Sequence, residues 1–359
     1  MSRLDTFLRM AADQRASDLH FHAGKPPTVR YNGDLVPLPY RVLTEDETRR
    51  FIFEFLTPEQ KDHLEREQEL DFAYVLDGVA RFRVNAFVQT AGLGAVFRVI
   101  PTTVPSYDEL RLPAVLRTLA HMSRGLVLMT GPTGSGKTTT LAALIREINR
   151  TSKRHIITIE DPIEYMHEPI ESVVTQREVG QHAESFGAAL RSALRESPDV
   201  LVVGELRDYE TVSLALSAAE AGVLVFGTLH TNSAAKAVDR LIGACPAEVQ
   251  DQVRGILSVL LKGVVSQRLC KLASGEGRIA AVEVLLQTHS VAHLIRENKI
   301  HQLEAYLRTG EQSPFGMRSL ESALLELVLE GQVTLEEAMS TSGDPEQLER
   351  TVTQLRGLL

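Results

Sequence analysis

Residues 131–138 read Gly-Pro-Thr-Gly-Ser-Gly-Lys-Thr, which has the spacing G-x-x-x-x-G-K-[ST] of a phosphate-binding loop. The apolar run Leu126–Met129 precedes the loop and predicts a buried strand, while the segment that follows it, as far as Asn149, predicts a helix. Glycines let several backbone N–H groups converge on one anion, and the start of the helix adds partial positive charge. A glycine-rich turn with a chance lysine is the alternative, but the strand and the helix favour a loop that binds a nucleoside triphosphate.

The loop assigns a role to individual side chains. We expect Lys137 to reach the β- and γ-phosphates of ATP, and the Thr138 hydroxyl to occupy one position on Mg²⁺. The predicted nucleotide-binding residues are Thr133, Gly134, Ser135, Gly136, Lys137, Thr138 and Thr139.

On both sides of the loop, short apolar runs alternate with helical segments. The predicted strands are Leu126–Met129, Ile156–Ile159, Val200–Val203, Val223–Phe226 and Ile279–Val284. The predicted helices are Thr138–Asn149, Phe186–Glu196, Asp208–Ala221 and Ser233–Ile242. This alternation predicts an α/β core over residues 113–287, with a mainly parallel sheet covered on both faces. After Leu286 apolar residues recur only at helical spacing, so residues 288–359 are predicted to form a helical C-terminal subdomain.

Residues 1–100 have a different pattern, that of a small α+β domain. Asn32-Gly33 and Asp77-Gly78 each separate two strand-like runs, which predicts two hairpins. Between them, Thr44 and Glu47 have capping-box spacing and open a predicted helix with Phe51, Ile52 and Phe55 on one face. The proline-bounded segment that follows interrupts both periodicities, so we place a linker and hinge at residues 101–112.

Two acidic segments follow predicted strands, as the hydrolysis of a γ-phosphate requires. The run 199–205 is an apolar strand that ends in Glu205, which we expect to hold the hydration shell of Mg²⁺. The segment 160–164 places three carboxylates within five residues, which is costly unless a cation lies nearby. Here we predict that Glu164 orients the attacking water and that Glu160 is structural or faces the metal. The alternatives are a strand that merely ends at a solvated acid for Glu205, and a solvated acidic turn for the segment 160–164.

A histidine and several arginines complete the candidate catalytic residues. His230 ends the run 223–229 and is a candidate sensor of the γ-phosphate, although a lone histidine is often a buried structural residue. Arg81, Arg83 and Arg98 lie in the first domain and are candidates to reach a neighbouring subunit's nucleotide in a ring. Without such a ring they are solvated arginines on a strand face. Arg191 and Arg195, four apart on a predicted helix, are weaker candidates.

Composition limits the kinds of partner. The 359 residues are 43% hydrophobic and 24% charged, with a formal net charge of -9, which disfavours a general nucleic-acid coat. Aromatic residues are only 5% of the chain and tryptophan is absent, so few side chains are available to stack on bases. Two cysteines, Cys245 and Cys270, are too few for a disulfide framework. With no long apolar stretch and no signal-peptide core, we expect a cytoplasmic protein.

Taken together, several motifs resemble those of the type IV pilus retraction motors, the PilT-type twitching-motility ATPases of the secretion ATPase superfamily. The matching stretches are GPTGSGKTT at 131–139, ITIEDPIEY at 157–165, QREVG at 176–180, ALRSALRESPDVLVVGELRD at 189–208 and FGTLHTNSAAKAVDR at 226–240. ASDLHFHAGKPPTVRYNGDL at 16–35 resembles the N-terminal opening of the same family. The resemblance covers nearly the whole chain.

The resemblance implies a PAS-like first domain, a RecA-like second domain and a homo-hexameric ring with nucleotide between subunits. It implies that GPTGSGKT is the Walker A loop, EDPIEY the Asp box with Glu164 in the catalytic position, GELRD the Walker B segment with Glu205, and TLHT the His box. In such a ring Arg81, Arg83 and Arg98 become plausible contacts to a neighbour's nucleotide. The implied partners are the inner-membrane platform protein of a pilus machine and, indirectly, pilin, which places the chain at the inner face of the cytoplasmic membrane.

The chain departs from the family pattern at three places. Val223 stands where the His box has its earlier histidine, so only His230 can serve. Residues 88–91, Val-Gln-Thr-Ala, replace Asn-Gln-Asn-Arg and remove one possible trans arginine. Residues 290–297 keep the apolar face and the Arg296-Glu297 end of the retraction signature, but Ala292-His293 replaces a polar pair.

The sequence leaves other functions open. An accessory motor paralogue is one, and an extension or secretion ATPase is another, although those usually add a long N-terminal region and a four-cysteine metal site. A RecA-like nucleic-acid motor is less favoured, because the chain offers few aromatic side chains to stack on bases. A ring subunit that binds ATP without hydrolysing it is less favoured, because Lys137, Glu164 and Glu205 are all present.

Overall fold

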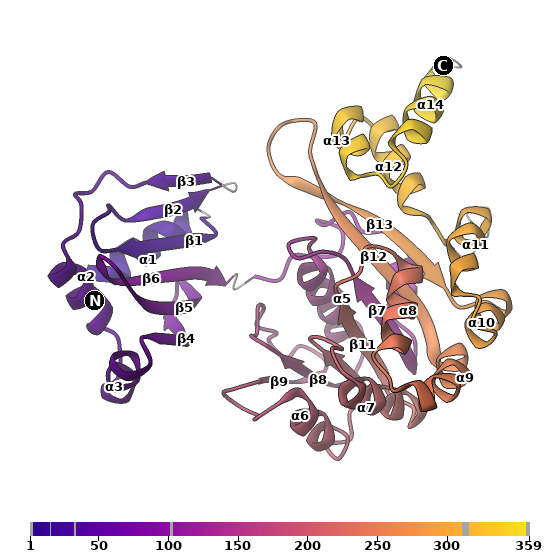
Figure 1. Ribbon diagram of the computed structural model, residues 1–359, viewed down its shortest axis with the longest axis horizontal. Coiled ribbons are helices and arrows are strands. Elements are labelled where there is room, and N and C mark those ends of the chain that lie inside the picture. The colour runs from indigo at the N-terminus through magenta and orange to yellow at the C-terminus, as the bar shows by residue number, and fades with distance from the viewer. Residues whose placement is uncertain (1–2, 15, 32–33, 101–102, 311–315, 357–359) are drawn as a thin grey trace. The chain divides into compact units, whose positions relative to one another are not determined.

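The computed structural model describes residues 3–14, 16–31, 34–100, 103–310 and 316–356 (Figure 1). The chain forms two compact units, residues 1–103 and residues 104–359, and each is described here by itself. The expected linker, 101–112, stays a prediction. Val104, Tyr107 and Leu112 of this segment are buried within the second unit.

A six-stranded antiparallel sheet forms the first unit, in the order β3-β2-β1-β6-β5-β4. Its strands are β1 (Asp18–His22), β2 (Thr28–Tyr31), β3 (Asp34–Pro37), β4 (Glu69–Leu76), β5 (Ala80–Gln89) and β6 (Gly92–Ile100). Three helices accompany the sheet: α1 (Arg3–Asp13), α2 (Glu45–Phe53) and α3 (Pro58–Glu67). Buried and more exposed residues alternate along β5, so one face of the sheet belongs to a core that contains Phe21, Phe82 and Phe97.

Local sequence signals predicted several of these elements correctly. Strands β2 and β3 pair on either side of Asn32-Gly33, where the predicted turn lies outside the described residues, and β4 pairs with β5 around Asp77-Gly78. Thr44 and Glu47 form the predicted reciprocal capping box at the start of α2. Helix α2 ends at Phe53, however, so Phe55 lies beyond the helix that was expected to carry it, and it packs against Phe97. Helices α1 and α3 and strands β1 and β6 were not predicted.

The second unit contains a seven-stranded sheet in the order β13-β12-β7-β11-β10-β8-β9. The strands are β7 (Gly125–Thr130), β8 (His155–Glu160), β9 (Val173–Glu178), β10 (Val200–Val203), β11 (Leu224–Leu229), β12 (Leu261–Lys271) and β13 (Arg278–Leu286). Neighbouring strands are parallel except β13, which pairs antiparallel with β12. The mainly parallel sheet is confirmed, but β9 and β12 were missed.

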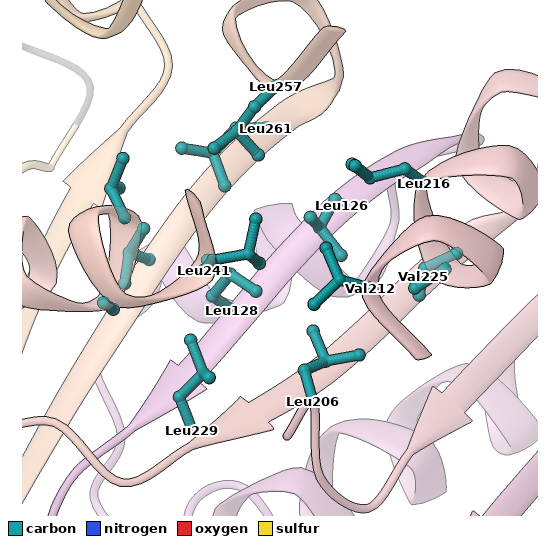
Figure 2. Packing of buried hydrophobic residues seen from close by; sticks show 14 of the residues in the cluster. Leu126, Leu128, Leu206, Val212, Leu216, Val225, Leu229, Leu241, Leu257 and Leu261 are labelled. Carbon is teal, nitrogen blue, oxygen red and sulfur yellow. The ribbon is translucent and has the colours of Figure 1, made fainter. Parts of the chain in front are cut away.

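Helices cover both faces of this sheet, as predicted. They are α4 (Val115–Ala120), α5 (Lys137–Thr151), α6 (Phe186–Ala193), α7 (Tyr209–Glu220), α8 (Ala234–Gly243) and α9 (Gln250–Leu260). Buried side chains of α4 and α5 pack with one face, and those of α6 to α9 pack with the other. Figure 2 shows the second of these packings, with Leu126 and Leu128 of β7 among side chains from β11, α7 and α8.

The end of the chain is helical, as predicted. Its helices are α10 (His289–Arg296), α11 (Leu303–Gly310), α12 (Leu320–Leu329), α13 (Leu335–Thr341) and α14 (Pro345–Arg356). Helices α12 to α14 form a hydrophobic cluster with Cys270, Ile279 and Ala281 of the β12–β13 hairpin. Figure 1 shows these helices, in yellow, beside the far end of that hairpin. In the part of the chain that the structure describes, no helix is both long and apolar enough to cross a membrane.

Candidate nucleotide-binding and catalytic site

Central strand β7 carries the phosphate-binding loop between itself and helix α5. All six residues of β7 are buried, and the N-cap of α5 is Gly136, which has no side chain to cap the helix. Gly131, Gly134 and Gly136 have φ values of 146°, 78° and 85°, in the region that favours glycine. The first turn of α5 therefore offers backbone N–H groups and positive partial charge to an anion.

The loop glycines are also required by close packing. A Cβ on Gly131 would lie 2.4 Å from the backbone oxygen of Gln267 and 2.6 Å from Ser135 Oγ. A Cβ on Gly136 would lie 2.8 Å from Gln267 Nε2. Strand β12, which carries Gln267, thus lies directly against the loop.

Lys137 is buried at the start of α5, and its ammonium group turns towards the loop. The Nζ atom donates to the backbone oxygens of Gly131, at 2.7 Å, and Pro132, at 3.0 Å. Burial lowers the pKa of Lys137, while the charges of Glu205 and Glu164 act to raise it. The lysine is therefore near both predicted catalytic acids.

Glu205 lies just beyond β10 and interacts with the side chains of Arg207 and His230. Arg207 is 2.7 Å from Glu205 Oε2, and His230 Nε2 is 3.4 Å from the same atom. Burial opposes ionisation of Glu205, but the hydrogen bond from Arg207 and the contact with His230 outweigh it and lower the pKa of the carboxyl. The structure thus brings Glu205 and His230 together, and it adds Arg207, which was quoted within GELRD but given no role.

Glu160, the last residue of β8, and Glu164, just after the strand, lie in different surroundings. Glu160 accepts hydrogen bonds from Thr158 Oγ1, at 2.6 Å, and Gln176 Nε2, at 3.3 Å. Burial raises the pKa of Glu160, while the hydrogen bonds from Thr158 and Gln176 oppose that shift. Glu164 is exposed, and both glutamates line the same cavity, so burial and hydrogen bonding distinguish the two.

Strand β9 fixes the segment that carries Glu164. Gln176 Nε2 donates to the backbone oxygen of Tyr165 at 2.9 Å, and Glu178 accepts from the backbone N–H of Ile163 at 3.1 Å. The Tyr165 hydroxyl lies 3.0 Å from Thr139 Oγ1 on α5. The two sequence neighbours of Glu164 are therefore both hydrogen-bonded to β9, an edge strand that was not predicted.

These residues surround a cavity of about 270 Å³. Of the seven predicted nucleotide-binding residues, Thr133, Gly134, Lys137 and Thr138 line it, together with the predicted catalytic residues Glu164, Glu205 and His230. Ser135 is buried, and within the described part of the chain its hydroxyl finds no hydrogen-bond partner. Burial lowers the pKa of His167, a further lining residue, to about 4, so its imidazole is neutral at physiological pH.

The predicted arginines lie in the first unit, on neighbouring strands. Arg81 and Arg83 are on β5, and Arg98, on β6, is paired in register with Arg83. Arg98 Nε lies 2.9 Å from a carboxylate oxygen of Asp18, and 66% of its side chain is exposed. These three stay candidates. In the second unit, Arg191 forms an ion pair with Glu210.

The parallel sheet, the loop at its central strand and the acids at the ends of the neighbouring strands define a P-loop nucleoside triphosphatase with a RecA-like core. The family model described as "Type II/IV secretion system protein" matches residues 2–340. The chain belongs to this family of ATPases.

Named relatives agree with this assignment. The type IV pilus retraction ATPase PilT of Pseudomonas aeruginosa is 47% identical over 339 residues, which cover 94% of this chain and 98% of the relative. A twitching motility protein of Neisseria gonorrhoeae is 47% identical over 322 residues, covering 90% of this chain and 86% of the relative. The crystal structure of the pilus retraction motor PilT with bound ADP superposes with a TM-score of 0.88 at 43% identity, covering 98% and 99% of the two chains. The predicted family, fold class and ATPase activity are confirmed.

Proposed function

We propose that this protein is an ATP-hydrolysing ring motor that powers the retraction of type IV pili. One observation carries the chemistry: Lys137, Glu164 and Glu205, from three separate segments, meet at one cavity beside the phosphate-binding loop. The similarity to proteins named as pilus retraction ATPases supports retraction as the work performed.

In this proposal the loop and helix α5 bind the phosphates of ATP. The amide groups at the start of α5 and the ammonium of Lys137 face negative charge, and Lys137 exchanges its bonds to the loop carbonyls for bonds to phosphate. The buried hydroxyl of Ser135 is a further donor available within the loop.

The residues at the cavity also suit Mg²⁺ bound together with ATP. Within the described ranges there is no cluster of three or more His, Cys, Asp or Glu residues arranged to hold a metal ion. Magnesium at nucleotide sites needs no such cluster, because one or two side chains act with phosphate oxygens and water. Thr138 and Glu205 would supply these side chains, and the ion would neutralise charge on the β- and γ-phosphates.

Glu164 is the residue that we assign to the attacking water. Its carboxylate orients the water and accepts a proton as the water oxygen bonds to the γ-phosphorus and the bond to the β-phosphate oxygen breaks. We also assign to His230 the role of sensing whether the γ-phosphate is still present, and its contact with Glu205 supports this role.

We further propose a homo-hexamer in which Arg81, Arg83 and Arg98 reach the nucleotide of a neighbouring subunit. Arginine suits this task because its planar guanidinium stays charged and binds phosphate oxygens in pairs. Rotation of the two units about the segment 101–112 would convert hydrolysis into movement. The proposed partner is the platform protein of a pilus machine at the inner face of the cytoplasmic membrane, with pilin moved indirectly.

Replacement of one carboxyl tests the catalytic assignment. The Glu164→Gln variant is expected to bind ATP like the wild type but to release phosphate at a rate lower by a factor of at least about 100, because general-base catalysis contributes that much. Glu168→Gln, in the same segment and exposed, is the matched control and should retain activity. Turnover of Glu164→Gln at the wild-type rate would remove Glu164 from the catalytic role.

Deletion of the gene tests the direction of the work. Surplus pili that do not retract are the result expected for a retraction motor. Absent pili would instead indicate an extension motor, and unchanged pilus number and retraction would indicate an accessory role.

A further inference from the structure

Gln267 of β12 is buried, with 2% of its surface exposed, and its amide group connects two parts of the nucleotide site. Its Nε2 donates to the backbone oxygen of Ser135, inside the phosphate-binding loop, at 2.8 Å. Its Oε1 accepts from Thr140 Oγ1, in the first turn of α5, at 2.8 Å. One side chain thus bridges the loop and the helix that follows it, from a strand about 130 residues further along the chain.

The backbone of the same residue contacts the other end of the loop. Its carbonyl oxygen occupies the space in which a side chain on Gly131 would lie, and its Nε2 does the same at Gly136. Gln267 therefore leaves no room for a side chain at the first or the last glycine of the loop, and its hydrogen bond holds Ser135 between them.

The contacts use the chemistry of an amide specifically. One end donates a hydrogen bond to a carbonyl and the other accepts one from a hydroxyl, and an ionised carboxylate can only accept. A buried donor or acceptor that loses its partner is expensive, so the amide has a defined orientation at this position.

We propose that Gln267 is a positioning residue that holds the loop 131–136 in the shape that binds nucleotide, through one donated and one accepted hydrogen bond. The inference rests on the nucleotide site proposed above. It assigns a role at the nucleotide site to β12, which lies outside both the Walker motifs and the acidic segments.

The Gln267→Glu variant tests this proposal because its effect depends on pH. Above the pKa of the new carboxyl group, the side chain cannot donate to Ser135, and the affinity for ADP should fall by at least about tenfold relative to the wild type at the same pH. Below that pKa, the protonated acid regains one O–H donor, and the ratio of the two affinities should return towards one. Fluorescent ADP, titrated at intervals between about pH 5 and pH 8.5, measures this ratio; burial raises the pKa of a carboxyl into that range.

Gln287→Glu is the matched control. Gln287 also donates to backbone carbonyls, those of Ser258 and Val259, but it is not among the residues that line the cavity. The same change of charge there should leave the affinity for ADP unchanged at every pH.

A double-mutant cycle gives a second test that does not need the acid to be tolerated. Gln267→Leu and Thr140→Val each break the bond between Oε1 and the hydroxyl, so their effects on ADP affinity should be less than additive in the double variant. Thermal unfolding and circular dichroism establish that each variant is folded before its affinity is compared.

Two results would overturn the proposal. One is a Gln267→Glu variant that binds ADP like the wild type across the pH range. The other is a folded variant whose loss of affinity is the same at all pH values, which would indicate a packing role. If the wild-type protein itself bound no ADP, the proposed nucleotide site would fail instead.

Discussion

Lys137 illustrates how one buried charge is tolerated. Its ammonium group donates to two loop carbonyls, and the carboxylates of Glu205 and Glu164 oppose the effect of burial on its pKa. A buried cation without such partners would shed its proton. The arrangement keeps a positive charge beside the amide groups that start α5, where it can meet phosphate.

Removal of this ammonium should abolish nucleotide binding. In Lys137→Ala the loop keeps its amides but loses the only cation that the motif places at the β- and γ-phosphates. ADP and ATP titrations by calorimetry should show no saturable heat at concentrations that saturate the wild type. Lys153→Ala, on the exposed surface after α5, should bind as the wild type does. Binding by both variants would contradict the assignment of Lys137.

Glu160 gives a pH-dependent effect on stability. Burial places its pKa above the ordinary value, so the folded protein binds more protons than the unfolded chain between the two pKa values. The contribution of Glu160 to stability therefore falls as pH rises through this interval and stays low above it. In Glu160→Gln the amide oxygen can still accept from Thr158 and Gln176.

The expected outcome is that Glu160→Gln melts at a higher temperature than the wild type at pH 8. The difference should shrink towards zero as pH falls below the ordinary pKa of a glutamate. Thermal unfolding followed by circular dichroism at several pH values measures it. A constant difference, or one that grows towards acid, would show that folding does not raise the pKa of Glu160.

The sequence predicted the motif residues of the site but not the residues that hold them. Lys137, Glu164, Glu205 and His230 were predicted from spacing or from their position after an apolar strand, and all four line one cavity. Gln267 was missed because a single glutamine in a strand has no local signature. Its role depends on contact with residues that lie far away in the chain.

Among the secondary structure elements, the two strands of the second unit that were missed share a polar composition. Strand β9, at the edge of the sheet, reads VVTQRE, and β12 has Lys262, Ser266, Gln267 and Arg268 within its length. Continuous apolar runs identified β7, β8, β10 and β11 because parallel strands buried on both faces need them. The polar residues of β9 and β12 instead bond to the segment of Glu164 and to the phosphate-binding loop.

Helix α7 begins with a cap that directly follows the Glu205 segment. The Asp208 carboxylate accepts from the backbone N–H of Thr211 at 2.9 Å, and the two residues form a reciprocal box. Asp208→Ala should lower the free energy of unfolding by about 1 kcal/mol, while Asp208→Asn should cost much less because asparagine also caps helices. Urea unfolding compares the two; equal midpoints for Ala and Asn would exclude capping as the cause.

On the scale of the full chain, each unit has a hydrophobic core of its own. The first unit's main cluster consists of residues between 4 and 99, and the described residues that line the nucleotide cavity belong to the second unit. A fragment of residues 104–359 should therefore fold and bind ADP with an affinity close to that of the full chain. If arginines of the first unit act in trans, the same fragment should release little phosphate.

A shorter fragment, 104–287, provides the contrast. It lacks α12 to α14, so Cys270, Ile279 and Ala281 of the hairpin would lose the apolar side chains that cover them. Exposed apolar patches promote association, so this fragment should bind a hydrophobic dye and aggregate in size-exclusion chromatography. A monodisperse fragment that binds no dye would show that the hairpin is stable without its cover.

The cover of the β12–β13 hairpin also has a consequence during synthesis. The ribosome completes Cys270, Ile279 and Ala281 well before it adds the α12 to α14 residues that bury them. Until that segment emerges, the nascent chain exposes these apolar side chains, although the residues that line the nucleotide cavity have already been synthesised. Chaperone demand should therefore peak late in translation, and early stop codons in this region should yield insoluble protein rather than a shortened enzyme.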